Sequence, residues 1–497
     1  MPSPDEPAPS ERRSALERLL SVFTQVKAGE GISAVLLTLN VFLLLTAYYV
    51  IKPLRDSMIG VMEAGPQYKS YLSAVIAVAL LGAVPAYARY AKRLPRNRLV
   101  VGVTLFFVSN LALFALAMSS HTLRAARIPL GPLGAILPTS SVELMPVVFF
   151  VWVGLFNMMV VAQFWAFAND VYTEEQGQRL FAMVGIGASS GAALGAGVVK
   201  TMARQLDTAE LFAVSAILLS LCALLTQVVH VRETRRPEGG RQKAIKDQNA
   251  GDIGAATEAG KKSGEGAFQM VWRHRYLTYL AAFSVVFTLV NTNGEYMRDE
   301  AMNQWVMGAV DDHGPFESGE ALHDFKEEMG NAFTGDFYFY VNLLGALLQM
   351  FVVSRLVRYA GLGPTFFVLP VIAVMGATAI ALAPVLAVVR ISKIAENATD
   401  YSINNTTRNM LWLPTTTEMK YQAKQAVDTF FVRMGDVGSA VTVAVLAGVL
   451  GLGIRAFAVA NLFLLVGWLF LAAAILRERK VLRDSQEHDE RKEATAT

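Results

Sequence analysis

The sequence contains few of the residues that form disulfides, bind metals or carry out covalent catalysis. It has a single cysteine, Cys222, in 497 residues, which excludes a disulfide framework or a thiolate metal site within one chain. The histidines are also few, and none has a partner at metal-ligand or catalytic-triad spacing: His121, His230, His274, His313, His323 and His488. We therefore expect no enzyme activity, no metal and no cofactor.

Charged residues are also scarce. They make up 17% of the chain, against 54% hydrophobic residues, and the mean hydropathy is +0.40, a balance that no soluble domain needs. Apolar segments long enough to cross a bilayer recur from one end of the chain to the other. We predict an all-α membrane protein with twelve transmembrane helices in two six-helix halves, near residues 32–57, 70–92, 98–119, 145–169, 180–201, 208–231, 275–297, 335–357, 363–385, 387–412, 426–451 and 455–477.

A polar linker separates the two halves. It is rich in Gly, Lys and Glu and has no apolar period, which is typical of a flexible connection. Before the first span, apolar residues at helical spacing predict an amphipathic helix on the membrane surface between Glu11 and Lys27. The predicted parts are a cytoplasmic amino-terminal segment (1–31), an amino-terminal half (32–231), a cytoplasmic linker (232–268), a carboxy-terminal half (269–477) and a cytoplasmic tail (478–497).

Charge in the loops predicts the orientation. Loop 90–98, the linker and the tail are basic, so they should face the cytoplasm. The loop from Arg298 to Asp336 carries ten Asp or Glu residues against one Arg and one Lys, so it should lie outside, and we expect short helices in it. Both termini are then cytoplasmic. The first residues lack the charged-then-apolar order of a secretory signal, and we expect a multi-pass protein of the cell (inner) membrane.

The first span ends in a polar stretch, residues 48–56 (YYVIKPLRD). Charges near a span are costly, at roughly 2.5–3.5 kcal/mol each at the bilayer centre. Helical spacing places four polar side chains on one face: Tyr48, Lys52, Arg55 and Asp56. Two interpretations are open. Either the helix has reached the headgroups and the charges snorkel, or the charges line a pathway for a solute.

A weak internal repeat favours the second interpretation. A shift of 243 residues takes 55–56 (RD) to 298–299 (RD) and takes Lys52 to Glu295. A shift of 247 residues aligns the fourth span with the tenth, as one duplication with a small insertion would give. Lys52 and Glu295 would then face each other across a central cavity. We expect them to compensate each other's charge in at least one conformation, because a lone buried charge is penalised.

The fourth, seventh and tenth spans are also polar. One full face of the tenth span cannot touch lipid, because its polar groups would lack partners there: Lys393, Asn397, Asp400, Asn404 and Thr407. The seventh span adds Asn291 and Glu295, and the fourth adds Asn157 and Asp170. These side chains either line water or form internal pairs that only hold helices together.

Two other patterns concern packing and gating. The fifth span has glycines four residues apart, at 187, 191 and 195, which is typical of a close-packing helix face. The cytoplasmic run 415–428 is charged and helical. It is either an ordinary solvated loop or an inner gate that includes Lys424 and Asp428.

Three motifs together resemble the ATP:ADP antiporter family, the nucleotide transporters of plastids and obligate intracellular bacteria. They are 46–57 (TAYYVIKPLRDS), 164–170 (FWAFAND) and 413–420 (LPTTTEMK) followed by Lys424 and Asp428. The resemblance covers most of 30–477 and implies a major facilitator-like fold and binding of ATP. In that family, basic residues that match Lys52, Arg55 and Lys424 are associated with nucleotide transport. The amphipathic start looks more like the free-living bacterial branch, whose substrate is unassigned.

One departure from the family supports an alternative. The nucleotide carriers have an acidic residue upstream of the Phe-Trp pair, where this chain has Val153 and Gly154. A non-transporting scaffold or sensor on a transporter-like fold is therefore the rival hypothesis. A scaffold should have its polar spans packed shut, whereas a transporter should have a wet pocket that reaches Lys52.

The leading prediction is a secondary active transporter of an organic anion, with a nucleotide in ATP/ADP exchange as the solute that the resemblance implies, working by alternating access. Its partners would be that solute and the lipid bilayer, with no nucleic acid and no obligate protein partner. The expected substrate-binding residues are Tyr48, Lys52, Arg55, Asn157, Asn291, Glu295, Lys393, Asp400 and Asn404. The expected gating or charge-coupling residues are Asp56, Asp170, Arg298, Asp299, Lys424 and Asp428.

Overall fold

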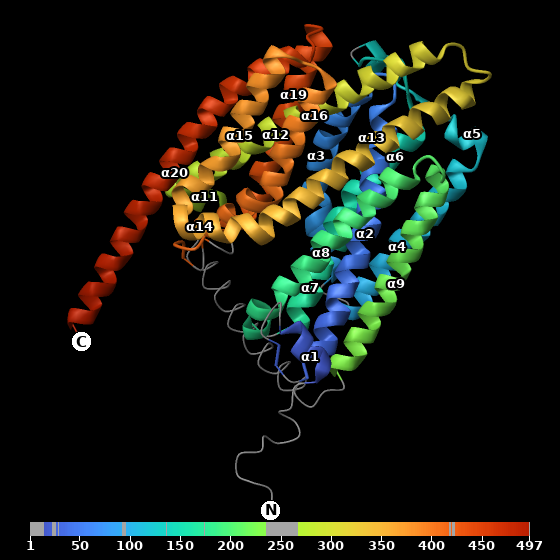
Figure 1. Ribbon diagram of the computed structural model, residues 1–497. Helices are drawn as coiled ribbons and strands as arrows, with labels where there is room; N and C mark the ends of the chain where they lie inside the picture. The colour runs from blue at the N-terminus through green and yellow to red at the C-terminus, as the bar shows by residue number, and fades with distance from the viewer. Residues whose placement is uncertain are drawn as a thin grey trace, which may run out of the picture.

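The computed structural model describes residues 14–21, 26–27, 29–91, 96–135, 137–172, 174–234, 267–416, 419 and 423–496. The described chain is almost entirely helical (Figure 1). Most of the predicted linker lies outside these residues, as do residues 11–13 and 22–25 of the predicted amphipathic helix, and residues 26–27 are not helical. The described part of that helix is α1, Ala15–Leu20.

The amino-terminal half consists of long helices joined by short connections. Its helices are α2 (Gly31–Gly60), α3 (Gly65–Ala91), α4 (Arg96–Met118), the continuous run of α6 (Leu144–Phe156), η2 (Asn157–Val161) and α7 (Ala162–Val171), then α8 (Glu174–Met202) and α9 (Thr208–Thr234). Between α4 and α6 lie α5 (His121–Arg124), η1 (Gly131–Ala135) and a two-stranded antiparallel sheet of β1 (Arg127–Pro129) and β2 (Ser141–Glu143).

The carboxy-terminal half follows the same plan, with π-helical turns inside several helices. Its elements are α11 (Ala267–Arg273), α12 (Arg275–His313), α13 (Gly319–Leu347), η3 (Leu348–Val353), α14 (Ser354–Ala360), α15 (Leu362–Leu382), α16 (Leu386–Thr399), η4 (Asp400–Asn404), α17 (Asn405–Leu411), α18 (Lys424–Ala426), η6 (Val427–Phe431), α19 (Val432–Val443), η7 (Ala444–Val449) and α20 (Ile454–Ala496).

Ten helical segments of the described chain are long and apolar enough to cross a membrane. A helix also occupies each of the two remaining predicted spans, but neither α3 nor the run 386–411 is among the ten. In the run 386–411 the reason is visible in the sequence, because it carries four charged residues within eleven positions: Arg390, Lys393, Glu396 and Asp400.

The prediction of an outer loop was wrong. We expected a loop with short helices from Arg298 to Asp336, but α12 continues to His313 and α13 begins at Gly319. Gly314 ends α12 with a positive φ of 82°, a conformation that glycine adopts without steric cost. Ser318 then caps α13 by accepting a hydrogen bond from the Ala321 amide. The acidic residues in this part of the sequence suggested a loop, but most of them lie on two long helices.

Close helix packing confirms the predicted glycine face of the fifth span. A Cβ on Gly191 of α8 would collide with the backbone carbonyl oxygen of Phe42 in α2. In the other half, a Cβ on Gly435 of α19 would lie 2.7 Å from the carbonyl oxygen of Val285 in α12. Each half therefore packs one helix against its first helix at a distance that only glycine permits.

Each half has a large apolar core of its own, and helices of the two halves meet between these cores. On one side of the interface α13 packs against α2 and α8, and on the other α3 packs against α12 and α19 (Figure 1). The helices α2, α3, α12 and α13 therefore bring the polar stretches of the two halves together.

Candidate functional site

Two matching Arg-Asp pairs lie at the interface between the halves. In α2, the Nε and Nη2 atoms of Arg55 lie 2.8 and 2.6 Å from Oδ1 of Asp56. In α12, the same atoms of Arg298 lie 2.8 and 2.6 Å from Oδ1 of Asp299. The sequence shift of 243 residues had aligned these two pairs. The identical local geometry is what a duplicated helix would retain.

The two pairs are joined across the interface. Nη2 of Arg298 lies 3.5 Å from Oδ2 of Asp56, and the Tyr338 hydroxyl donates a 2.5 Å hydrogen bond to the same oxygen. Nζ of Lys69 lies 3.3 Å from Asp56 and 2.7 Å from Asp299, so it bridges the two carboxylates. We call these six residues the interhalf cluster: Arg55, Asp56, Lys69, Arg298, Asp299 and Tyr338.

Burial makes the interhalf cluster costly to disrupt. The side chains of Asp56 and Asp299 are 0% exposed, and that of Arg298 is 1% exposed. Charges removed from water are tolerated only when they are paired and hydrogen-bonded, so each member depends on the others. The charge-coupling role predicted for Asp56, Arg298 and Asp299 stays a prediction, but the structure brings the three together. All three are buried inside the protein.

Sequence reasoning missed Lys69. The predicted second span began at residue 70, so Lys69 counted as a loop residue, whereas α3 begins at Gly65 and buries it. A usable signal was present, because no other charged residue follows Lys69 before Arg89. A single charge inside an apolar helix is a reason to look for a partner.

Lys52 is held differently from the other cations. Its Nζ has no carboxylate within ion-pair distance among the described residues, and it donates a 3.1 Å hydrogen bond to the Tyr401 hydroxyl. It also lies 4.5 Å from the centre of the Tyr338 ring and 5.4 Å from that of Tyr49. Aromatic faces attract a cation without neutralising it. Lys52 therefore keeps its charge available to an anion.

The expected compensation of Lys52 by Glu295 does not take the form of a direct pair in this structure. Among the described residues, the hydrogen bond of Lys52 goes to Tyr401, and no ion pair joins Lys52 to Glu295. Compensation in another conformation stays a prediction.

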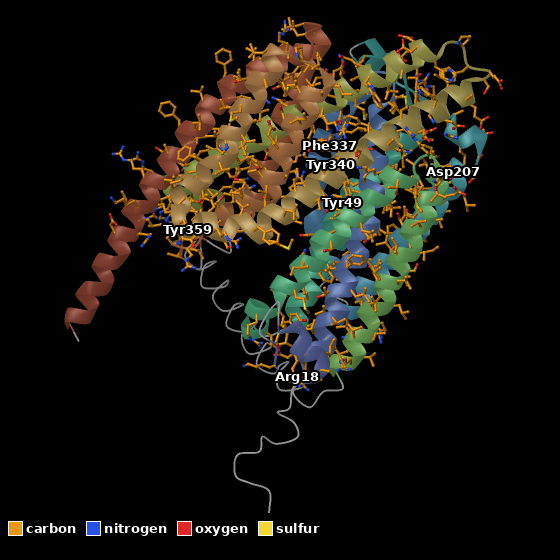
Figure 2. All side chains as sticks on the ribbon, viewed as in Figure 1. Arg18, Tyr49, Asp207, Phe337, Tyr340 and Tyr359 are labelled. Carbon is orange, nitrogen blue, oxygen red and sulfur yellow. The ribbon has the colours of Figure 1, made fainter. Side chains whose placement is uncertain are left out.

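A cavity of about 660 Å³ lies between the two halves, next to residues that contact Lys52. Its wall includes Tyr49 and Tyr401, both of which contact Lys52, and residues from α2, α8, α13, η3, η4 and α17. Figure 2 shows Tyr49 where the first-half helices meet α13, and its ring packs 6.1 Å from that of Tyr338. The volume is within the roughly 300–1,000 Å³ typical of small-molecule sites.

The tenth-span residues are buried as the pattern predicted. Lys393 is 0% exposed and donates to Glu396 at 2.6 Å and to Asn291 at 3.5 Å. Asn404 donates a 2.6 Å hydrogen bond to Asp400. These contacts lie within the carboxy-terminal half, and no described ion pair joins them to the interhalf cluster.

The remaining predicted residues are spread over other places. Tyr48 packs in the apolar core of the amino-terminal half, with its ring 6.0 Å from that of Phe156. Asn157 is exposed at the start of η2, and the side chain of Asp170 lies outside the described residues. Lys424 and Asp428 form a 3.1 Å ion pair. Arg408 of α17 approaches the same carboxylate at 3.8 Å, so this group links the tenth and eleventh helices.

Family models and relatives agree with the resemblance found in the motifs. The Major Facilitator Superfamily model matches residues 37–395, and the TLC ATP/ADP transporter model matches residues 346–479. ADP,ATP carrier protein 1 of Chlamydia pneumoniae is 24% identical, over 88% of this chain and 91% of the relative. ADP,ATP carrier protein 1 of Chlamydia trachomatis is 22% identical, over 87% of this chain and 88% of the relative.

Solved structures show the same fold at low sequence identity. A D-xylose-proton symporter matches with a TM-score of 0.55 and 14% identity, over 88% of this chain and 97% of that chain. The nucleoside transporter NupG matches with a TM-score of 0.55 and 12% identity, over 90% and 98%. The predicted major facilitator-like fold is thereby confirmed, and the two transporter family models favour transport over the scaffold alternative. The chain belongs to the Major Facilitator Superfamily of membrane transporters.

Proposed function

We propose that this transporter exchanges nucleotides of the ATP/ADP type across the membrane. The observation that carries the proposal is Lys52, a cation without a carboxylate partner in the described chain, beside a cavity between the two halves. A phosphate oxygen is a strong acceptor for such a cation, and partial removal from water strengthens the interaction. The Chlamydia relatives, named as ADP,ATP carriers, supply the candidate solute.

The arrangement of charges along α2 supports an alternating-access mechanism. The cavity is lined by Leu45 and Tyr49, which precede Lys52, whereas the interhalf cluster involves Arg55 and Asp56, which follow it. Lys52 therefore lies between an accessible side and a side closed by buried ion pairs. Closure of one side while the other is accessible is what a rocking pair of halves requires.

Orientation follows from charge in the loops. We propose twelve spans in two halves, with both termini on the cytoplasmic side of the cell membrane, because basic loops favour that side. In Figure 1, α1 and the start of α2 lie at one end of the molecule, and the interhalf cluster lies toward the opposite end of α2. The conformation described is then the one that is closed toward the outside.

A counterflow assay tests the function. Purified protein in liposomes loaded with ADP should take up labelled ATP from outside, and Lys52→Ala should abolish that uptake while the protein remains folded. Lys480→Ala is the matched control, because Lys480 is exposed on α20. This variant should exchange nucleotides at the normal rate. Near-normal exchange by Lys52→Ala, or no exchange by the unmodified protein, would contradict the proposal.

A further inference from the structure

The cavity beside Lys52 has a wall without charge. Within the described residues that line it, no side chain is ionised. Three rings, those of Tyr49, Phe181 and Tyr401, and neutral polar groups that include Gln349 and Asn405 form much of the surface. Such a wall does not favour a phosphate group, which would be bound without a cation. It suits an uncharged, flat group with hydrogen-bonding edges.

Two amide groups in this wall have unused donors. Thr406 donates to the carbonyl oxygen of Gln349 at 3.5 Å, and Asn409 donates to that of Asn405 at 3.4 Å. The NH₂ groups of Gln349 and Asn405 have no hydrogen-bond acceptor in the described part of the chain, and both side chains are exposed to the cavity. Side-chain amides of this kind pair with the edges of nucleobases, and adenine is the base that Asn and Gln bind in a bidentate manner.

The local backbone gives an independent indication. Gln349 lies in the π-helical turn η3, Tyr401 lies in the π-helical turn η4, and these two turns contact each other. Single π-helical turns inside α-helices occur frequently at functional sites, because the extra residue redirects nearby side chains. Gln349 and Met350 of η3 and Tyr401 of η4 line the same cavity as the first-half residues Tyr49 and Phe181.

We propose that this cavity is the subsite for the nucleobase and ribose of the solute, with the phosphates at Lys52. The inference rests on the proposed function and deepens it. One end of the site then recognises charge, and the other recognises the base through ring stacking and amide hydrogen bonds. Tyr49 and Tyr401 contact both parts, since each lines the cavity and also contacts Lys52.

Calorimetric titration of the purified full chain with three probes tests the subsite. The probes are ADP, ribose 5-phosphate, which lacks the base and the second phosphate, and pyrophosphate, which lacks both base and sugar. The unmodified protein should bind ADP more tightly than either of the others. The double variant Gln349→Leu with Asn405→Leu should weaken ADP binding roughly 10-fold to 100-fold, as the loss of two hydrogen bonds gives. Its affinity for pyrophosphate should not change, which also verifies that the variant is folded.

Controls separate the two levels of the proposal. Lys52→Met should weaken the binding of both ADP and pyrophosphate. Gln304 is exposed far along α12, so Gln304→Leu should change neither affinity. If ADP binds but the double variant leaves the ratio of ADP to pyrophosphate affinity unchanged, the subsite is wrong and nucleotide transport stands. Equal affinity for ADP and ribose 5-phosphate also excludes the base subsite. If the unmodified protein does not bind ADP, both the subsite and the proposed function are wrong.

Discussion

Arg298 of α12 lies 3.5 Å from Asp56 of α2, so the second half of the chain places a cation on the acid of the first half. Each residue also pairs with a neighbour in its own helix, Asp299 and Arg55 respectively. The two Arg-Asp pairs thus form one group of charges at the interface between the two halves. The halves are held together by charge as well as by apolar contact.

Neutralising Asp56 should destabilise the protein strongly. Asp56→Asn keeps the shape of the side chain but leaves Arg55, Arg298 and Lys69 with one carboxylate fewer in a buried site. Breaking a buried ion pair typically costs about 3–5 kcal/mol. Thermal unfolding in detergent measures the effect, and Asp311→Asn, at an exposed position of α12, is the control. A midpoint equal to that of the control would mean that the cluster contributes no stability.

Removing Lys69 should favour the conformation in which the outer side is open. Lys69 bridges Asp56 and Asp299, and without it two buried carboxylates face each other. We expect Lys69→Ala to increase labelling of a cysteine placed at Ser57, which is buried between α2 and α13, by a membrane-impermeant maleimide added outside. The measurement is feasible because the single native thiol, Cys222, is buried and can be replaced by alanine.

The control for that experiment is a cysteine at Glu317, an exposed position between α12 and α13. Its labelling should be fast with or without Lys69. If Ser57→Cys is labelled at the same rate in both backgrounds, Lys69 does not keep the outer side closed.

The contact between α8 and α2 should not tolerate a methyl group. Gly191→Ala adds a Cβ that collides with the backbone of α2 at Phe42, and overpacking of this kind costs about 1–3 kcal/mol. Gly467→Ala in α20 is the matched control, because nothing lies within 4 Å of its added Cβ. Alanine there should leave the unfolding midpoint unchanged or raise it, since alanine favours helix. Equal midpoints for the two variants would show that the helices adjust without cost.

Acid should release a contact at the start of α2. Burial by itself raises the pKa of Glu30, but hydrogen bonds from Arg179 at 2.9 and 3.1 Å, from the Lys27 amide and from Gln176 outweigh it and hold the pKa below 4.5. A carboxyl group whose pKa is lower in the folded state than in the unfolded state stabilises the fold fully at any pH above its pKa in the unfolded state. That stability is lost as the pH falls through the folded pKa.

Glu30→Gln isolates this contribution. The difference in unfolding midpoint between the unmodified protein and the variant should be largest near neutral pH and should shrink as the pH falls below about 4.5, the ordinary value of the group. Thermal scans in detergent from neutral to acidic pH measure it. A difference that stays constant over that range would show that the Glu30 carboxylate has the same pKa in both states.

The sequence by itself determined the kind of protein and several of its polar sites. Apolar segments of membrane length required helices, because a backbone in lipid must satisfy its own hydrogen bonds. The repeated Arg-Asp pair and the polar face of the tenth span were visible as patterns, and the structure buries most of these side chains. The glycines of the fifth span indicated close packing, which Gly191 shows.

Only the tertiary structure decided which charges pair with which. Helical periodicity gives the face on which a residue lies, but it does not give the helix that this face meets, because that depends on how all the helices cross. For this reason the bridge formed by Lys69 was not foreseen, nor were the contacts of Lys52 with tyrosines. Tyr338 and Tyr401 lie about 290 and 350 residues from Lys52 in sequence, separations at which local patterns carry no information. The cavity beside Lys52 likewise exists only where the two folded halves meet.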